Sequence, residues 1–131
     1  MLYLLDSNTV IYARDGSGPV LAKFAQFDGS ISMSAIVLAE LQRGFFKAGS
    51  QADLRKARLE ELVARIPVVA FDADAARRYG RIIADVGWAR GKDFDRMIAA
   101  HALSLGATLV TNNQADFSDI PGLVLENWTV P

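Results

Sequence analysis

The sequence predicts an α/β protein in which a sheet is flanked by helices. Short apolar runs alternate along the chain with longer segments whose apolar residues recur at helical spacing, and this alternation is typical of the class. The length of 131 residues suits one domain, and no repeat, low-complexity tract or linker interrupts the sequence. We therefore expect a single domain over residues 1–131.

Each predicted element follows from its local pattern. Strands are expected where short apolar runs are bounded by turn residues, at residues 2–5, 30–33, 67–71, 107–110 and 123–125. Helices are expected through residues 10–12, at 19–27, 35–47 and 51–66, from 72 through 83, and at 94–105. Asp6 and Asp72 are favoured helix N-caps, and Gly106 is a favoured helix-terminating residue.

The composition excludes several kinds of protein. Apolar residues make up 51% of the chain, which is enough for one core and argues against disorder. Cysteine is absent, so disulfides, thiolate nucleophiles and Cys-based zinc sites are excluded. The N-terminal apolar run is interrupted by Asp6, and there is no stretch of about 18 apolar residues. We expect a cytoplasmic protein with no membrane association.

The charges are distributed unevenly although their sum is only −1. Residues 43–96 contain twelve Lys or Arg and eight Asp or Glu, whereas residues 97–131 contain three acids and no Lys or Arg. The basic middle segment either contacts a phosphate backbone or is an ordinary charged helix surface. The sequence leaves both interpretations open.

Acidic and amide side chains follow the predicted strands at positions where ligands bind in open α/β sheets. Asp6 comes directly after the first strand, and Asn112, Asn113 and Asp116 follow the strand at 107–110. If the two strands are parallel neighbours, these side chains share one edge of the sheet. Asp93 and Asp95 begin a helix that faces the same edge in this arrangement.

Each acid also has a purely structural interpretation. Asp6 suits an N-cap, Asp95 complements a helix dipole in a first turn, and Glu40 can pair with Arg43 three residues on. However, Glu40 lies beside apolar positions of its helix, and buried acids are costly unless they are paired or bound to a metal. A cluster of carboxylates therefore suggests a cation with oxygen ligands, Mg²⁺ or Mn²⁺.

Other chemistries are poorly supported. His101, the only histidine, lies on an apolar helix face, which favours packing over catalysis. The Gly16-Ser17-Gly18 loop lacks the Lys and Ser or Thr of a P-loop. Trp88, Trp128 and the Phe45-Phe46 pair are able to stack on bases, but core or partner packing is the favoured interpretation for each.

In order and context these residues resemble PIN-domain proteins, specifically the VapC-type toxins of type II toxin–antitoxin pairs. The matching stretches are LLDSNTVIY, SAIVLAELQRG, GKDFDRMIAAHALSLGATLVTNN and PGLVLENW, which together span almost the whole chain. The resemblance implies a three-layer α/β/α sandwich with a parallel sheet and a carboxylate site for one or two Mg²⁺ or Mn²⁺ ions. It also implies endonucleolytic cleavage of RNA, often tRNA or ribosomal RNA, and inhibition by an antitoxin encoded beside the toxin.

The family's site residues carry over to named positions of this chain. Its first acid falls on Asp6, its helix-borne second acid on Glu40 and its third on Asp95, whereas Asn113 stands where a fourth acid is usual. Asp116 is the nearest substitute. The resemblance implies that Asp6 and Asp95 hold the metal, with Glu40 as a further ligand or as the base that orients water.

The partners expected from this assignment are an RNA substrate and a cognate VapB-type antitoxin, with a homodimer and a hetero-oligomer as the assemblies. Two other functions stay open. One is a catalytically silent PIN module that only binds RNA or protein, because Asn113 weakens the acid set. The other is a small phosphatase of the haloacid dehalogenase type, because DSNTV resembles its nucleophile loop, although Asn8 replaces the general acid.

Overall fold

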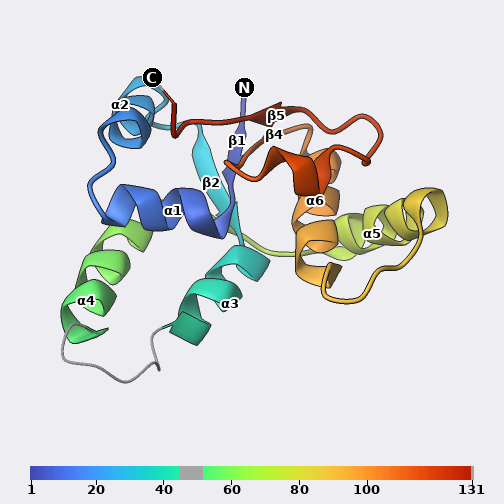
Figure 1. Ribbon diagram of the computed structural model, residues 1–131, viewed down its shortest axis with the longest axis horizontal. Helices are drawn as coiled ribbons and strands as arrows, with labels where there is room; N and C mark the ends of the chain where they lie inside the picture. Colours follow the sequence, from blue (N-terminus) through green and yellow to red (C-terminus); the bar gives the residue numbers. More distant parts are fainter. Residues whose placement is uncertain (45–51, 131) are drawn as a thin grey trace.

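The computed structural model describes residues 1–44 and 52–130. Five parallel strands form one sheet: β1 (Tyr3–Leu5), β2 (Ile31–Ser34), β3 (Val68–Val69), β4 (Thr108–Val110) and β5 (Leu125–Glu126). Their order across the sheet is β3-β2-β1-β4-β5 (Figure 1). In this register Tyr3 lies opposite Ile31 on one side and Thr108 on the other.

Helices connect the strands as the sequence predicts. They are α1 (Ser7–Arg14), α2 (Gly18–Gln26), α3 (Ala35–Gly44), α4 (Ala52–Val63), α5 (Ala73–Val86) and α6 (Asp93–Leu105), with a short 3₁₀ helix, η1 (Gln114–Phe117), after β4. No helix in the described residues is long and apolar enough to cross a membrane. The predicted end of the third helix, residues 45–47, lies outside the described residues, as do Phe45 and Phe46.

Three predicted strands differ from those observed by one residue at an end, and the other two differ more. The strand expected at residues 67–71 is reduced to Val68–Val69, because it lies at the sheet edge and pairs only with β2. The chain then turns into the N-cap of α5, where Asp72 Oδ1 accepts a hydrogen bond from the Ala75 amide at 3.0 Å. The last strand, expected at 123–125, is Leu125–Glu126, since its register is set by pairing with β4.

The helices form a layer on each side of the sheet. Helix α1 packs against α2, α3 and α4, whereas α5 packs against α6. The chain steps from β1 to β2 to β3 in one direction across the sheet, and from β3 back to β4 in the other direction. Because such crossovers are right-handed, the helices of the first two connections and those of the third lie on opposite faces. Figure 1 shows α1, α2 and α4 on one side of the strands and α5 and α6 on the other. The predicted three-layer α/β/α sandwich is confirmed.

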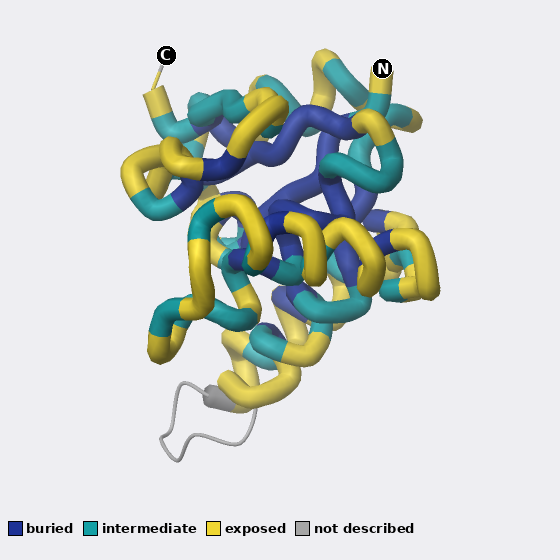
Figure 2. The backbone as a smooth tube through the Cα atoms, turned by 90° about the vertical axis from the view of Figure 1, so that its right-hand side faces the viewer, coloured by how far each residue is buried: buried dark blue, intermediate teal, exposed yellow. Residues whose placement is uncertain are grey.

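The central strands and a C-terminal aromatic cluster make up much of the core. All three residues of β1 and of β4 are buried, as expected for a parallel sheet covered on both faces. Figure 2 shows that the buried, dark blue backbone runs through the centre of the molecule. Trp128 is 1% exposed, and its ring contacts those of Tyr3, Phe24 and Phe27. The packing interpretation of Trp128 is therefore confirmed.

The strand order reverses between β1 and β4. The chain leaves β1 toward β2 and returns after β3 to place β4 on the free side of β1. The two strand ends are joined there, because the Asp6 amide donates a hydrogen bond to the Val110 carbonyl at 3.0 Å. Such a switch point at the carboxyl ends of parallel strands is where ligands bind in open α/β sheets.

Candidate active site

Asp6 leaves β1 at this switch point and caps α1. Its Oδ1 accepts a hydrogen bond from the Thr9 amide at 2.8 Å, and the residue is 7% exposed. Burial raises the pKa of the Asp6 carboxyl, and hydrogen bonding by Thr111 and Thr9 opposes that rise. The capping interpretation of Asp6 is confirmed, and the same side chain lines a pocket at the sheet edge.

Glu40 reaches the pocket from α3. It is half-buried, and its Oε1 accepts a hydrogen bond from Ser7 Oγ at 2.7 Å. The pairing of Glu40 with Arg43 that the sequence allowed is not found in the described residues, because the Arg43 guanidinium lies over the Phe94 ring instead, 5.7 Å from its centroid. Sequence reasoning missed the Ser7–Glu40 contact, which joins positions 33 residues apart and leaves no local signal.

Asp95 lies half-buried in the first turn of α6. Burial raises the pKa of its carboxyl most, the charges of Asp116, Glu40 and Asp6 raise it further, and Lys92 opposes them. The carboxylates of Asp116, Glu40 and Asp6 therefore lie close enough to repel that of Asp95. Repulsion of this kind is relieved when a cation binds among the acids.

The pocket itself is small. Its volume is about 90 Å³, so it is a shallow site that suits a metal ion with part of its water shell. The pocket is lined by Asp6, Ser7, Asn8, Glu40, Asp95, Ile98, Asn113 and Phe117.

The pocket offers carboxylate and amide oxygen atoms, which are the kind of ligand that Mg²⁺ binds. Within residues 1–44 and 52–130, no three Asp, Glu or His side chains are already arranged to hold an ion. The Asp6 and Glu40 carboxylates each accept one hydrogen bond, from Thr9 and Ser7, and keep further lone pairs for a ligand. Magnesium usually keeps several waters and is bound through only one or two carboxylates together with substrate phosphates. Asp6 and Asp95, which both line the pocket, fit such a site.

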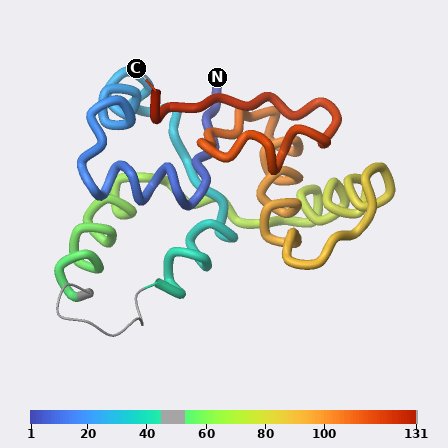
Figure 3. The backbone as a smooth tube through the Cα atoms, in the orientation of Figure 1, coloured from blue at the N-terminus to red at the C-terminus, as the bar shows by residue number. Residues whose placement is uncertain are grey.

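The segment after β4 folds back toward α6. Helix η1 packs against α6 (Figure 3), and the side-chain amide of Asn113 donates a hydrogen bond to Asp116 Oδ2. Asn113 lines the pocket directly. Asp116 does not line it, but of the neighbouring carboxylates its charge has the largest effect on the pKa of Asp95.

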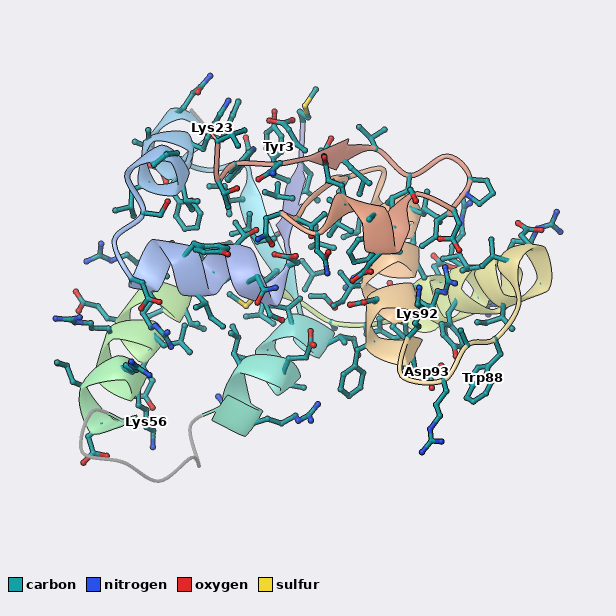
Figure 4. The ribbon with its side chains drawn as sticks, viewed as in Figure 1. Tyr3, Lys23, Lys56, Trp88, Lys92 and Asp93 are labelled. Atoms are coloured by element: carbon teal, nitrogen blue, oxygen red, sulfur yellow. The ribbon has the colours of Figure 1, made fainter. Side chains whose placement is uncertain are left out.

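Two other residues have structural partners. Asp93 Oδ1 accepts a hydrogen bond from Tyr79 Oη at 2.7 Å, so Asp93 ties α6 to α5 and does not line the pocket that Asp95 lines. Figure 4 shows it beside Lys92 at the start of α6.

His101 is 1% exposed, its Nδ1 is hydrogen-bonded to Ser34 Oγ at 2.8 Å, and burial lowers its pKa. The packing role of His101 is confirmed.

Sequence comparison agrees with this architecture. The sequence profile of the PIN domain family matches residues 3–123. A Rickettsia felis protein named ribonuclease VapC2 is 36% identical over 138 residues, which cover 98% of each chain. A Shigella flexneri protein named tRNA(fMet)-specific endonuclease VapC is 34% identical, over 97% of this chain and 98% of that protein.

Structural comparison gives the same result. The VapBC2 complex of Rickettsia felis, bound to a promoter DNA fragment, contains a chain that matches with a TM-score of 0.86 and 34% identity over 98% of this chain and 99% of its own length. DNA-bound VapBC of Salmonella typhimurium matches with a TM-score of 0.87 and 32% identity at the same coverage. This chain belongs to the PIN domain family and, within it, to the VapC proteins. The phosphatase alternative is wrong.

Proposed function

We propose that this protein is a Mg²⁺-dependent endoribonuclease that acts as the toxin of a toxin–antitoxin pair. The observation that carries the proposal is the pocket at the strand switch point, where Asp6, Glu40 and Asp95 come together from three different elements. The relatives named ribonuclease VapC support the same activity. The protein acts in the cytoplasm, where its RNA substrates are.

The roles of the acids follow from their positions. Asp6 and Asp95 hold the ion, and Mn²⁺ is an alternative to Mg²⁺ because all the donors are oxygen atoms. A divalent ion supplies positive charge that offsets the carboxylates and the RNA phosphate and favours deprotonation of water. Glu40 is a further ligand or the base that orients the attacking water, and Ser7 fixes its orientation through the 2.7 Å hydrogen bond. No covalent enzyme intermediate is needed.

The proposed substrate is tRNA or ribosomal RNA, whose cleavage arrests translation and growth. The name of the Shigella flexneri relative, a tRNA(fMet)-specific endonuclease, favours tRNA. The small pocket is consistent with an RNA loop whose phosphate enters while its bases stay outside.

The proposed partner is a VapB-type antitoxin encoded beside the toxin. The structural neighbours are VapBC complexes, and an Arg from an amphipathic antitoxin segment can pair with the acid cluster by charge-assisted hydrogen bonds. Co-expression with the adjacent open reading frame is expected to give a complex, as a hetero-oligomer of toxin homodimers, and to remove toxicity. If neither a complex nor loss of toxicity is observed, this part of the proposal fails.

A silent PIN module is the second candidate, and Asn113 in place of a fourth acid favours it. Asp116 argues for an active site, since it lies close enough to Asp95 to raise that residue's pKa and supplies the charge that Asn113 lacks. An inactive protein would bind RNA or protein without cleaving it.

The experiment that separates these functions uses purified protein and total RNA. Cleavage is expected with Mg²⁺ and is expected to stop in EDTA or in the Asp95→Asn variant. The matched control is Asp74→Asn, which removes an exposed acid of α5 that is ion-paired with Arg77 at 3.0 Å. Cleavage that persists in Asp95→Asn would contradict the site assignment, and RNA binding without cleavage by the wild type would support the silent module.

A further inference from the structure

Outside the acid pocket, an exposed pair of side chains joins the two helices that carry Glu40 and Asp95. The Arg43 guanidinium of α3 lies over the Phe94 ring of α6, 5.7 Å from its centroid. Arg43 is exposed, and Phe94 is 38% exposed. Phe94 is not part of the core cluster, so part of its ring and the Arg43 guanidinium are accessible to a ligand.

The pair lies on the helices that carry two of the pocket's acids, although neither residue lines the pocket itself. Arg43 follows Glu40 by three residues on α3, which places both on one helix face about 4.5 Å apart along the axis. Phe94 directly precedes Asp95 on α6, and α3 and α6 pack against each other (Figure 1). Arg43 and Phe94 therefore join the two helices, while Glu40 and Asp95 from the same helices line the pocket.

A phosphate approaching the pocket meets several negative charges, so the site needs nearby cations to hold RNA. Arg43 supplies one, and Lys92, the residue before α6, supplies another, since its charge acts on both Asp95 and Asp119. Single-stranded RNA is recognised where unstacked bases lie on aromatic rings and Arg planes beside such cations. The combination of an exposed ring, a planar cation and an acid pocket suits this ligand.

We propose that Arg43 and Phe94 form the platform on which a single-stranded RNA segment is held next to the cleavage pocket. A base beside the cleaved bond stacks on the Phe94 ring, and the Arg43 guanidinium contacts a flanking phosphate. These are positioning residues, because neither reaches the reacting atoms. This inference rests on the proposed ribonuclease function and names the RNA contact of the same site.

The test measures RNA binding apart from cleavage. Fluorescent single-stranded RNA is titrated with proteins that carry Asp6→Asn and therefore do not cleave. Loss of one base stack is expected to weaken binding of a Phe94→Leu variant by about 5- to 150-fold, while Phe94→Tyr keeps the ring and restores affinity. In the cleaving protein, Phe94→Leu is expected to raise KM by a similar factor and to change kcat little.

Salt dependence separates the two side chains. Arg43→Gln is expected to reduce the slope of log affinity against log salt concentration by about 0.7, the value for one contact with a single-stranded phosphate, whereas Phe94→Leu leaves the slope unchanged. The matched control is Arg77→Gln. Arg77 shares a pocket on α5 with Ser104, which is about 14 Å along α6 from Asp95, so its loss is expected to leave affinity and slope unchanged.

The outcomes of this test are distinct from those of the proposed function. If the wild type cleaves RNA but Phe94→Leu and Arg43→Gln bind it as tightly as the parent protein, the platform is wrong and the nuclease assignment stands. A loss of antitoxin binding with unchanged RNA affinity would also overturn the platform and assign the pair to the protein partner. Equal losses in Phe94→Tyr and Phe94→Leu, with a lowered Tm in both, would show a purely structural role for Phe94.

Discussion

Replacing Asp95 by Asn is expected to stop RNA cleavage while making the metal-free protein more stable. Burial and the charges of Asp116, Glu40 and Asp6 raise the pKa of the Asp95 carboxyl, which means that its ionised form is disfavoured in the folded protein. Asn has almost the same volume and no charge. The substitution therefore removes the unfavourable charge without opening a cavity.

The size of the effect follows from two opposing contributions. Removal of an unfavourable charge in a functional site commonly stabilises a protein by about 0.5–2 kcal/mol. Loss of an acid from the first turn of a helix costs about 0.3–1 kcal/mol. Because the pKa of Asp95 is raised and not lowered, the first contribution exceeds the second. We expect a net gain of about 0.5–1 kcal/mol, or roughly 2–5 °C in Tm for a chain of this length.

The gain depends on pH, and its sign can be derived. Since the folded pKa of Asp95 lies above the ordinary value of 3.8, the folded state binds the proton more tightly than the unfolded state does. Ionisation of Asp95 therefore removes stability as pH rises from about 4 through the folded pKa, and below that range the penalty disappears. The advantage of Asp95→Asn over the wild type is expected to vanish near pH 4 and to be complete near pH 7.5.

The assay is thermal unfolding in EDTA at about pH 4 and about pH 7.5, with Asp74→Asn as the exposed control. Added Mg²⁺ is expected to make the Tm of the wild type higher than that of Asp95→Asn. At a Mg²⁺ concentration of 100 times Kd, binding stabilises the wild type by about 2.7 kcal/mol and the variant much less. An Asp95→Asn protein that melts below the wild type at neutral pH in EDTA would refute the reasoning. So would a variant that Mg²⁺ stabilises as much as it stabilises the wild type.

Further substitutions test the remaining assignments. Asp6→Asn is expected to stop cleavage without lowering Tm, because Asn caps helices as well as Asp does and burial already disfavours the ionised Asp6 carboxyl, whereas Asp6→Ala costs about 1 kcal/mol more than Asp6→Asn, measured by denaturant unfolding. Asp116→Asn is expected to raise the Mg²⁺ concentration for half-maximal cleavage and Asn113→Asp to lower it; an unchanged Mg²⁺ requirement in Asp116→Asn would make Asp116 structural. Trp128→Ala removes the centre of the aromatic cluster and is expected to lower the free energy of unfolding by about 3–5 kcal/mol in the same assay. A much smaller loss would contradict the central role of Trp128 in the core.

The outline of the fold was predictable because its signals are local. Helix periodicity and caps such as Asp6 and Asp72 involve residues within a few positions of one another, and the structure has the helices at the expected places. The ends of the strands were predicted less well. Only pairing with β2 and β4 fixes where β3 and β5 begin and end, and such pairing is set by residues distant in the sequence.

The candidate site was predictable in its residue types but not in its contacts. The sequence placed Asp93 and Asp95 together at one helix start, and only packing distinguishes their roles. Tyr79 on α5 donates a hydrogen bond to Asp93, whereas Asp95 lines the pocket. The hydrogen bond from Ser7 to Glu40 and the stacking of Arg43 on Phe94 join different helices. No spacing along the chain indicates either contact.

By itself, the sequence determined the α/β class, the order of helices and strands, and the family to which the chain belongs, because these follow from local patterns and motifs. The tertiary structure decided that β1 and β4 lie side by side, which brings Asp6 and Asp95 to one pocket. It also decided that the turn after β4 folds back so that Asp116 acts on Asp95. The physical reason is that like charges come this close only where the packing of strands and helices around them holds their backbones in place.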